Sequence, residues 1–413
     1  MLRVVILNDY ATVRGGADQV AIAGARALAD AGVEVLFVGG CGSGVSPRLE
    51  HRRITFQLLE GPDLLEQAGS LRGMAAGMWS RPAAAKVAKI LAECDPKESV
   101  VHVHGWTKAL TSSIFPTCHS LGFRPVVTLH DYFVSCPNGA FFEFPAGRIC
   151  RRRPLSASCL LTQCDRRGAL HKGWRSVRQF VQAGPGGLPR HLEHAIIISR
   201  HSEAVLEPAL PPSVRRYFVR NPAEIDRQPC VQASRGAAYL FVGRMTVEKA
   251  PDDLAEAALR AGVEARFCGD GYLKENVLKI NPRAAITGWM ERDKVLAEIR
   301  TARALVFPSI WHETFGLTVA EALAQGVPVI VSDACAAAEQ VVPGVNGLLY
   351  RGGEVADLAR VLELFKDDAL VEKLGRGAYD AFWNSPPTLE RHAKELGSVY
   401  DSVLASQVSP NRP

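Results

Sequence analysis

Runs of β-branched and other apolar residues recur along the first half of the chain, and stretches with helical spacing of apolar positions separate them. The runs fall at residues 4–7, 33–38, 100–104, 126–130 and 195–199. Residues 17–31 have the pattern of a helix, and Gly32 after them is a typical helix stop. Strands that alternate with helices predict βαβ units and therefore a parallel sheet.

A second series of the same kind fills the other half of the chain. Its strand candidates are residues 238–242, 264–268, 285–287, 304–307, 327–331 and 347–350. Helical patterns lie between them, for example at 251–261 and 292–302. Residues 389–404 have the apolar spacing of a last amphipathic helix. The two halves therefore look alike in architecture.

The stretch between the two series, residues 207–233, carries several prolines, which is typical of an interdomain connection. A chain of 413 residues is long enough for two full hydrophobic cores. We therefore predict an α/β protein with two Rossmann-like, doubly wound domains. The predicted bounds are 1–205 for the N-terminal domain, 206–235 for the connection, 236–385 for the C-terminal domain and 386–413 for a final helical segment.

Composition is that of an ordinary globular protein, with 47% hydrophobic and 22% charged residues. No apolar run approaches the roughly 18 residues that a membrane-spanning helix needs. The apolar run at the start, residues 1–7, is too short for the core of a signal peptide. We expect a cytoplasmic protein that is not exported.

Charge is unevenly distributed along the chain. Residues 1–205 contain 24 Lys and Arg against 16 Asp and Glu, a net charge of +8, and the remainder has a net charge of −3. Between Arg148 and Arg178 there are nine basic residues and one acid, Asp165. This basic segment is either a solvated loop face or a surface for anionic lipid headgroups or an anionic acceptor. Few aromatic residues are interleaved with the arginines and no reading motif accompanies them, so we expect no nucleic-acid partner.

Ten cysteines are present, and four of them cluster in and beside the basic segment: Cys136, Cys150, Cys159 and Cys164. None of their spacings is the tight C-x2-C pair of common zinc sites. Two interpretations stay open. The four are free thiols or a redox pair, or they hold a structural zinc ion together with His171. In a reducing cytoplasm the other six are most simply buried apolar residues.

Glu313 and Glu321 are the most informative pair of residues in the chain. A strand candidate precedes Glu313, and an alanine-rich helical stretch follows Gly316. The first N–H groups of that helix have no partners inside the helix and can hold an anion. Carboxylates on both sides of a phosphate cradle suit a nucleotide-sugar, which has hydroxyls at both ends and phosphate in the middle. Taken alone, each glutamate is also typical of a solvated charge or a helix cap.

Other candidate residues follow strands of both halves. Arg244 and Lys249 come after the strand candidate at 238–242 and can neutralise a diphosphate. The next two strand candidates are followed by glycines, at 269 and 271 after the first and in the Gly288-Trp289 pair after the second. These glycines either let a nucleobase approach the backbone or form ordinary turns. His130 ends a strand of the first half and is the best candidate to contact a reacting sugar. The chain has no D-x-D sequence, so the signature of a metal-bound nucleotide-sugar is absent.

Together these residues resemble glycosyltransferase family four, whose members are retaining enzymes with the two-domain GT-B fold. The resemblance covers nearly the whole chain. Its most specific parts are the Glu313-x7-Glu321 segment, Gly243-Arg244 with Glu248-Lys249, Gly269-Asp270-Gly271, Pro308-Ser309, Gly15-Gly16-Ala17-Asp18 and the strand ending at His130. Two departures are Asn221-Pro222, where the family often has Asn-Gly, and the cysteine-bearing insertion at 130–164.

The resemblance implies that the two domains face a central cleft and that residues 386–413 cross back to the N-terminal domain. It assigns catalytic roles to Glu313, His130, Arg244 and Lys249. Arg244 and Lys249 would bind the donor diphosphate, Glu313 the transferred sugar and Glu321 the ribose. The full donor-binding set is Gly16, Arg244, Lys249, Gly271, Trp289, Glu313, Thr314, Phe315, Gly316, Leu317 and Glu321.

The expected function is metal-independent, retaining transfer of a sugar from a nucleoside-diphosphate sugar, the co-substrate, without any cofactor. The expected acceptor is a glycan, lipid-linked in surface polysaccharide synthesis, which would place the protein at the inner face of the membrane. One alternative is a GT-B epimerase or a synthase acting on a soluble sugar phosphate. Another is a non-catalytic scaffold that binds a nucleotide-sugar.

Overall fold

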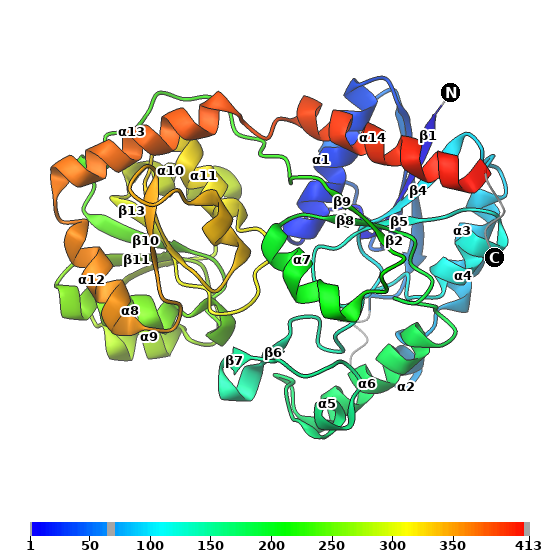
Figure 1. Ribbon diagram of the computed structural model, residues 1–413, viewed down its shortest axis with the longest axis horizontal. Helices are drawn as coiled ribbons and strands as arrows, with labels where there is room; N and C mark the ends of the chain where they lie inside the picture. The colour runs from blue at the N-terminus through cyan, green and yellow to red at the C-terminus, as the bar shows by residue number, and fades with distance from the viewer. Residues whose placement is uncertain (1, 64–70, 409–413) are drawn as a thin grey trace.

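The computed structural model describes residues 2–63 and 71–408 and contains two α/β domains side by side (Figure 1). The N-terminal domain has a seven-stranded parallel sheet in the order β3-β2-β1-β4-β5-β8-β9. Its strands are β1 (Arg3–Tyr10), β2 (Glu34–Cys41), β3 (Ile54–Gly61), β4 (Ser99–Val103), β5 (Val126–Thr128), β8 (His194–Ile197) and β9 (Arg215–Phe218).

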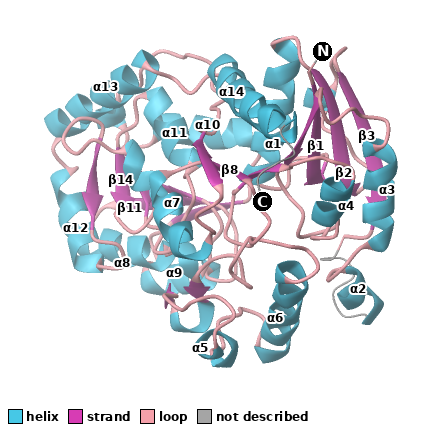
Figure 2. Ribbon diagram, turned by 45° about the vertical axis from the view of Figure 1, so that its right-hand side comes forward, coloured by secondary structure: helices cyan, strands magenta, loops and turns pink. Residues whose placement is uncertain are grey.

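Helices cover both faces of this sheet (Figure 2). The helices of the N-terminal domain are α1 (Gly16–Asp30), α2 (Leu71–Ala76), α3 (Arg81–Leu91), α4 (Ile114–Ser120), α5 (Ala157–Leu161), α6 (Ala169–Ala183) and α7 (Arg200–Leu206). Short 3-10 turns lie at η1 (Pro47–Leu49), η2 (Phe144–Ala146) and η3 (Glu207–Ala209). A small antiparallel pair, β6 (Phe142–Glu143) and β7 (Arg148–Ile149), lies in the cysteine-bearing insertion.

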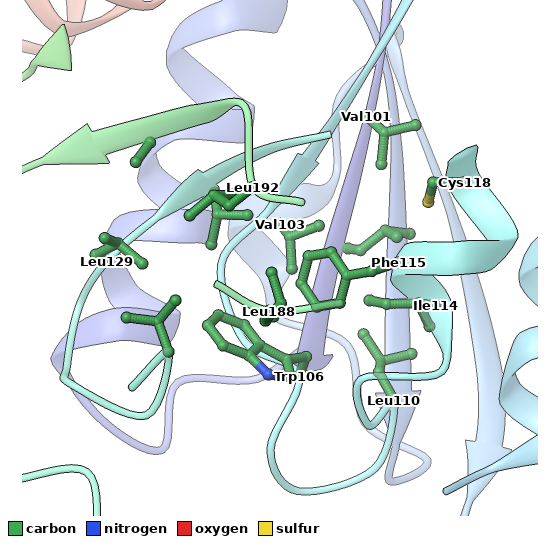
Figure 3. Close-up of a cluster of buried hydrophobic side chains, with 14 of the residues drawn as sticks. Val101, Val103, Trp106, Leu110, Ile114, Phe115, Cys118, Leu129, Leu188 and Leu192 are labelled. Carbon is green, nitrogen blue, oxygen red and sulfur yellow. The ribbon is translucent and has the colours of Figure 1, made fainter. Parts of the chain in front are cut away.

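The core of the N-terminal domain explains why its central strands are largely apolar, whereas the edge strands β3 and β9 are partly exposed. A parallel sheet between two layers of helices buries both faces of each central strand, so these strands lack an alternating polar face. On one face, Trp106 packs edge to face against Phe115, with ring centroids 5.5 Å apart (Figure 3). The indole N–H of Trp106 donates to Gln182 Oε1 at 3.0 Å, which ties the loop after β4 to α6.

The C-terminal domain repeats this architecture with six parallel strands in the order β12-β11-β10-β13-β14-β15. The strands are β10 (Ala238–Val242), β11 (Glu264–Cys268), β12 (Ala285–Gly288), β13 (Ala304–Phe307), β14 (Val329–Ser332) and β15 (Gly347–Tyr350). The helices are α8 (Pro251–Ala261), α9 (Lys274–Ile280), α10 (Arg292–Thr301), α11 (Leu317–Gln325), α12 (Val355–Leu364) and α13 (Asp368–Asn384). Three 3-10 turns complete it: η4 (Ala233–Arg235), η5 (Val247–Lys249) and η6 (Ala336–Gln340).

Each sheet has one direction change, which is the point where the chain stops adding strands on one side of the sheet and starts adding them on the other. In the first sheet the chain adds strands on one side of β1 and then returns to its other side with β4. In the second sheet β10 and β13 have the same relation. Ligands of open α/β sheets bind outside the carboxyl ends of the strands at such a point. The fold therefore directs attention to the loops after β1, β4, β10 and β13.

The last helix, α14 (Leu389–Val408), returns to the N-terminal domain and packs along α1 (Figure 1). Its Tyr400 is fully buried, and the hydroxyl lies 2.8 Å from His102 Nδ1. The other ring nitrogen of His102 lies 2.7 Å from Thr128 Oγ1. This buried chain of hydrogen bonds joins α14 to β4 and β5. Residues 409–413 of the predicted segment 386–413 lie outside the described residues.

One predicted boundary is wrong. The connection predicted at 206–235 starts too early, because residues 215–218 form β9, the edge strand of the first sheet. Tyr217 pairs with Ile196 of β8, and its hydroxyl lies 3.0 Å from His194 Nδ1. Pro211 and Pro212 lie in the loop before this strand, so they mark a turn inside the N-terminal domain. No helix within the described ranges has the length and apolarity that crossing a membrane requires.

Candidate functional site

The N-terminus of α11 lies at the direction change of the second sheet, at the end of the loop that follows β13. Gly316 caps the helix with a φ of +87°, and no side chain caps it. A Cβ atom at this position would lie 2.7 Å from Ala337 Cβ, so both the backbone conformation and the space require glycine. The first N–H groups of α11 have no partners within the helix. This helix end can therefore receive an anion.

Lys249 and Glu313 form an ion pair beside this helix end, and each side chain is only 17% exposed. The indole N–H of Trp311 donates to the same oxygen of Glu313 at 3.2 Å. The Lys249 ammonium also lies 5.4 Å from the centroid of the Trp311 ring. Burial lowers the pKa of Lys249 to about 8. The predicted cation and carboxylate are thus brought together and held by one aromatic side chain.

Arg244 lies next to this pair, but its side chain is largely exposed to solvent. Its side chain is 70% exposed, and its guanidinium lies 3.9 Å from Glu248 Oε1. Glu248 itself is buried, with a side chain 4% exposed. Arg244 follows Gly243 at the end of β10, while Glu313 follows β13, so the two lie on either side of the direction change. An exposed arginine at this point can turn toward an anion at the helix end.

Gly269 and Gly271 support the loop that carries Arg244. A Cβ atom at Gly269 would lie 1.8 Å from the Gly243 carbonyl oxygen, and one at Gly271 would lie 2.3 Å from that of Met245. The Met245 N–H donates to the Asp270 carbonyl at 2.9 Å. The close approach that these glycines permit is therefore an approach of the protein's own backbone. Trp289, after β12, is 76% exposed.

Glu321 lies one turn into α11, and burial raises its pKa, while Arg292 acts in the opposite direction. The Arg292 guanidinium donates to Glu321 Oε1 at 3.1 Å and to the Glu224 carbonyl at 2.8 Å. Sequence reasoning did not identify Arg292, because no local pattern distinguishes it from other basic residues at the start of a helix. The paired carboxylate keeps one oxygen for another hydrogen bond.

The N-terminal domain meets this site through α1 and the loop after β5. A Cβ atom at Gly16 would lie 3.2 Å from Leu317 Cδ1, so the beginnings of α1 and α11 are adjacent. The Thr314 hydroxyl donates to the His130 carbonyl at 2.9 Å. His130 Nε2 lies 2.9 Å from His104 Nδ1, and burial lowers the pKa of His130 to about 3. The lowered pKa favours the neutral form of His130 at physiological pH, in which the ring can donate or accept a hydrogen bond without adding charge.

The four clustered cysteines lie in one region, and the Lys172 ammonium lies among them, close to Cys159 and Cys164. Cys136 donates to Asn138 Oδ1 at 3.1 Å, and the Asn138 amide lies 3.4 Å from Cys164 Sγ. The Lys172 ammonium lies 3.7 Å from Cys159 Sγ. In the ranges that the structure describes, no three or more His, Cys, Asp or Glu side chains are placed to hold a metal ion. The arrangement does not support the zinc interpretation.

Many cations of the basic segment between Arg148 and Arg178 are paired with groups of the protein itself. Arg148 and Arg152 both pair with the buried carboxylate of Glu143, and Arg175 pairs with that of Asp165 at 3.2 Å. Further cations of the segment contact other parts of the protein: Arg166 with Glu248, Lys172 with Cys159, and Arg178 with the Thr107 carbonyl. These pairings reduce the charge that the segment can offer to a membrane surface.

Comparison with known proteins gives sequence matches over about a third to two thirds of the chain and structural matches over nearly all of it. Residues 224–381 match the family model described as glycosyl transferases group 1. A GDP-mannose-dependent alpha-mannosyltransferase of Mycolicibacterium smegmatis is 35% identical over 138 residues, which is 33% of this chain and 34% of the relative. A glycogen synthase of Mycobacterium tuberculosis is 26% identical over 275 residues, 62% of this chain and 64% of the relative. The matches thus span about a third to two thirds of these relatives.

Two solved structures align over nearly all of both chains. A sucrose-phosphate synthase from Thermosynechococcus elongatus has a TM-score of 0.69 at 18% identity and covers 98% of this chain and 99% of its own. HepE from Anabaena, solved in complex with UDP-glucose, has a TM-score of 0.67 at 17% identity and covers 97% and 100%. At such identities the likeness concerns the fold.

Proposed function

Because residues 224–381 belong to the glycosyl transferases group 1 family and the chain as a whole has the GT-B fold, we propose that the protein transfers a sugar from a nucleoside-diphosphate sugar. The family and the fold are those that the sequence predicted. One observation carries the proposal: Lys249, Glu313 and Arg244 meet at the open N-terminus of α11. Relatives named for GDP-mannose and a neighbour solved with UDP-glucose support a donor of this class.

The charges of the site suit the donor. A diphosphate carries negative charge that grows as the sugar leaves, and fixed cations and a helix end stabilise that charge in the transition state. Arg244 and Lys249 supply the cations, and the N–H groups of Phe315, Gly316 and Leu317 supply the helix end. When the diphosphate draws Lys249 to itself, Glu313 becomes available for the hydroxyls of the transferred sugar. Glu321, oriented by Arg292, is placed to accept hydrogen bonds from the ribose.

The proposed reaction is retaining and needs no metal ion. The bond between the anomeric carbon and the diphosphate oxygen breaks, and the acceptor oxygen forms its bond on the same face of the sugar. The proton of the acceptor hydroxyl passes to the leaving phosphate, so the site needs no separate base. Neutral His130 contributes a hydrogen bond beside the sugar without adding charge. Closure of the two domains excludes water, which would otherwise hydrolyse the donor.

The acceptor that we propose is a glycan on a lipid carrier, made for a surface polysaccharide at the inner face of the membrane. Support for it comes from the net charge of +8 on residues 1–205, which favours an anionic acceptor or membrane surface. Much of the positive charge between Arg148 and Arg178 is paired within the protein. Only the unpaired cations of residues 1–205 therefore support this acceptor.

The test is a screen of purified protein with UDP-, GDP- and ADP-sugars, in which donor consumption is measured with and without acceptor glycans. We expect one donor class to be consumed, with activity that persists in EDTA. Glu313→Ala should abolish turnover, whereas Glu275→Ala, a change at an exposed carboxylate of α9, should not. Conversion of the donor into another nucleotide-sugar would identify an epimerase instead, and binding without any turnover would identify a scaffold. Activity that is lost in EDTA and restored by magnesium would contradict metal independence.

A further inference from the structure

Arg166, two residues after the cysteine-bearing insertion of the N-terminal domain, reaches the loop that carries Arg244 in the C-terminal domain. Its guanidinium donates to Glu248 Oε1 at 2.7 Å. It also lies over two aromatic rings, 4.7 Å from the centroid of Phe144 in the insertion and 5.5 Å from that of Tyr272 in the C-terminal domain. A single arginine thus contacts both domains at the edge of the proposed donor site.

The insertion touches the same loop at a second point. A Cβ atom at Gly147 would lie 3.5 Å from Val247 Cγ2, and the Val247 N–H donates to the Tyr272 hydroxyl at 3.0 Å. Gly147 joins the short strands β6 and β7, which lie between the two domains in Figure 1. The insertion therefore packs against the loop at residues 243–249, near the phosphate end of the proposed donor.

Contacts within the N-terminal domain hold the backbone next to Arg166. Asp165, which is 2% exposed, pairs with Arg175 at 3.2 Å and with His171 at 3.0 Å, and it accepts the Arg167 N–H at 2.8 Å. The residues on both sides of Arg166 are therefore fixed by one buried carboxylate. Because the backbone around Arg166 is already ordered, less conformational entropy is lost when its side chain contacts the other domain.

Glu248 is shared by two arginines. Arg166 binds Oε1 directly, while Arg244 lies 3.9 Å from the same atom. The second oxygen, Oε2, is buried and has no hydrogen-bond partner among the described residues. A buried carboxylate without a cation costs free energy, so it attracts whichever cation can reach it. While Arg166 neutralises Glu248, Arg244 stays exposed and available.

We propose that Arg166 is a positioning residue for the donor diphosphate, acting from the other domain. By neutralising Glu248 it leaves Arg244 free to bind the diphosphate. Without Arg166, Arg244 closes the 3.9 Å gap to Glu248 and is withdrawn from the donor. Because Arg166 belongs to the N-terminal domain, donor affinity becomes coupled to the contact between the domains. This inference rests on the proposed function.

The test is a double-mutant cycle between Arg166 and Glu248, read as the dissociation constants of GDP and UDP by calorimetry and as KM and kcat for the donor. Arg166→Ala is expected to weaken binding of the preferred nucleotide about tenfold, the effect of losing one charge-assisted contact. In the Glu248→Gln background the same change should weaken binding less than about threefold, because a neutral side chain no longer captures Arg244. Arg166→Lys should restore part of the affinity.

The control is Arg376→Ala, which removes a surface arginine that pairs with Glu372 on α13. Exposed pairs of this kind contribute little, so nucleotide binding should not change. Equal losses from Arg166→Ala in both backgrounds would overturn the inference, since a loss of general structure does not depend on the charge of Glu248. An unchanged affinity for Arg166→Ala would overturn it too. If the unaltered protein binds no nucleoside diphosphate, the proposed function itself fails.

Discussion

Lys249 and Glu313 show how a charged site is prepared before its ligand is bound. The two side chains neutralise each other in a partly buried position, so neither is left as an isolated charge. Trp311 fixes Glu313 by a hydrogen bond and covers Lys249 with its ring. A diphosphate can replace Glu313 as the partner of Lys249, and this exchange keeps the charges of the site paired.

The titration of Lys249 gives a prediction for the pH dependence of catalysis. Burial lowers the pKa of Lys249 to about 8, from an ordinary value of 10.5. The ammonium therefore loses its proton as the pH rises through about 8, and the diphosphate loses one of its cations. We expect kcat/KM for the donor to fall above about pH 8, by up to about tenfold per pH unit.

Lys249→Arg provides the matched comparison, because a guanidinium stays protonated throughout this range. Its activity at neutral pH will be lower, since the shape of the head group differs, but its alkaline limb should be flat to about pH 10. A wild-type profile without an alkaline fall, or the same fall in both proteins, would show that Lys249 is not the titrating cation.

At the scale of elements, β13, the loop after it and α11 form the unit on which the site depends, and Gly316 is the N-cap at which α11 begins. Gly316→Ala is expected to lower the free energy of unfolding by about 2 to 4 kcal/mol, because the methyl group adds an overlap with Ala337 to the strain of a positive φ. Denaturant unfolding measures this loss, and donor affinity should fall with it.

Gly344→Ala separates the two causes. Gly344 also has a positive φ, of +79°, but a Cβ atom there would meet nothing within 4 Å. Its substitution should cost only about 1 kcal/mol and leave donor affinity unchanged. Equal effects of the two substitutions would mean that the contact with Ala337 has no role in forming the helix end.

The last helix makes a separate prediction. Tyr400→Phe removes the hydroxyl that lies 2.8 Å from His102 Nδ1 and leaves that buried nitrogen without a partner. We expect a loss of about 1 to 3 kcal/mol in unfolding free energy. Ser398→Ala, on the exposed side of α14, should change stability by less than about 0.5 kcal/mol. A Tyr400→Phe protein as stable as the wild type would contradict a structural role for this hydrogen-bonded chain.

The elements were predictable from sequence where burial decides them. Both faces of the central parallel strands are covered, so these strands appear as apolar runs, and Gly316 and Glu313 stand out because they follow such a run. Strand β3 was not among the predicted strands, and it is an edge strand with several exposed residues. Strand β9 was missed because it is a short edge strand with charged residues behind two prolines. Arg166 and Arg292 were missed because their roles come from contacts with residues far away in sequence, Glu248 and Glu321, and no local pattern marks such contacts.

At the scale of the whole molecule, the two domains touch on several sides of the proposed sugar site. Thr314 bonds to the His130 carbonyl, Arg166 pairs with Glu248, and the N–H groups of Arg200 and His201 at the start of α7 donate to Glu339 of η6. Apolar contacts accompany them, because Trp311 and Phe315 pack against the two hydrophobic clusters of the N-terminal domain. Relative motion is the general expectation for domains of one chain whose interface is in part polar. A donor bound to the C-terminal domain would then be covered by residues of the N-terminal domain.

The central claim is that Arg244, Lys249 and the N-terminus of α11 bind the diphosphate of the donor. The most direct test is the dissociation constant of the preferred nucleoside diphosphate, measured by calorimetry for the wild type, Arg244→Ala and Lys249→Ala. We predict that each substitution weakens binding by about 10- to 100-fold, as expected for losing a charge-assisted contact. Wild-type affinity in both variants would contradict the claim.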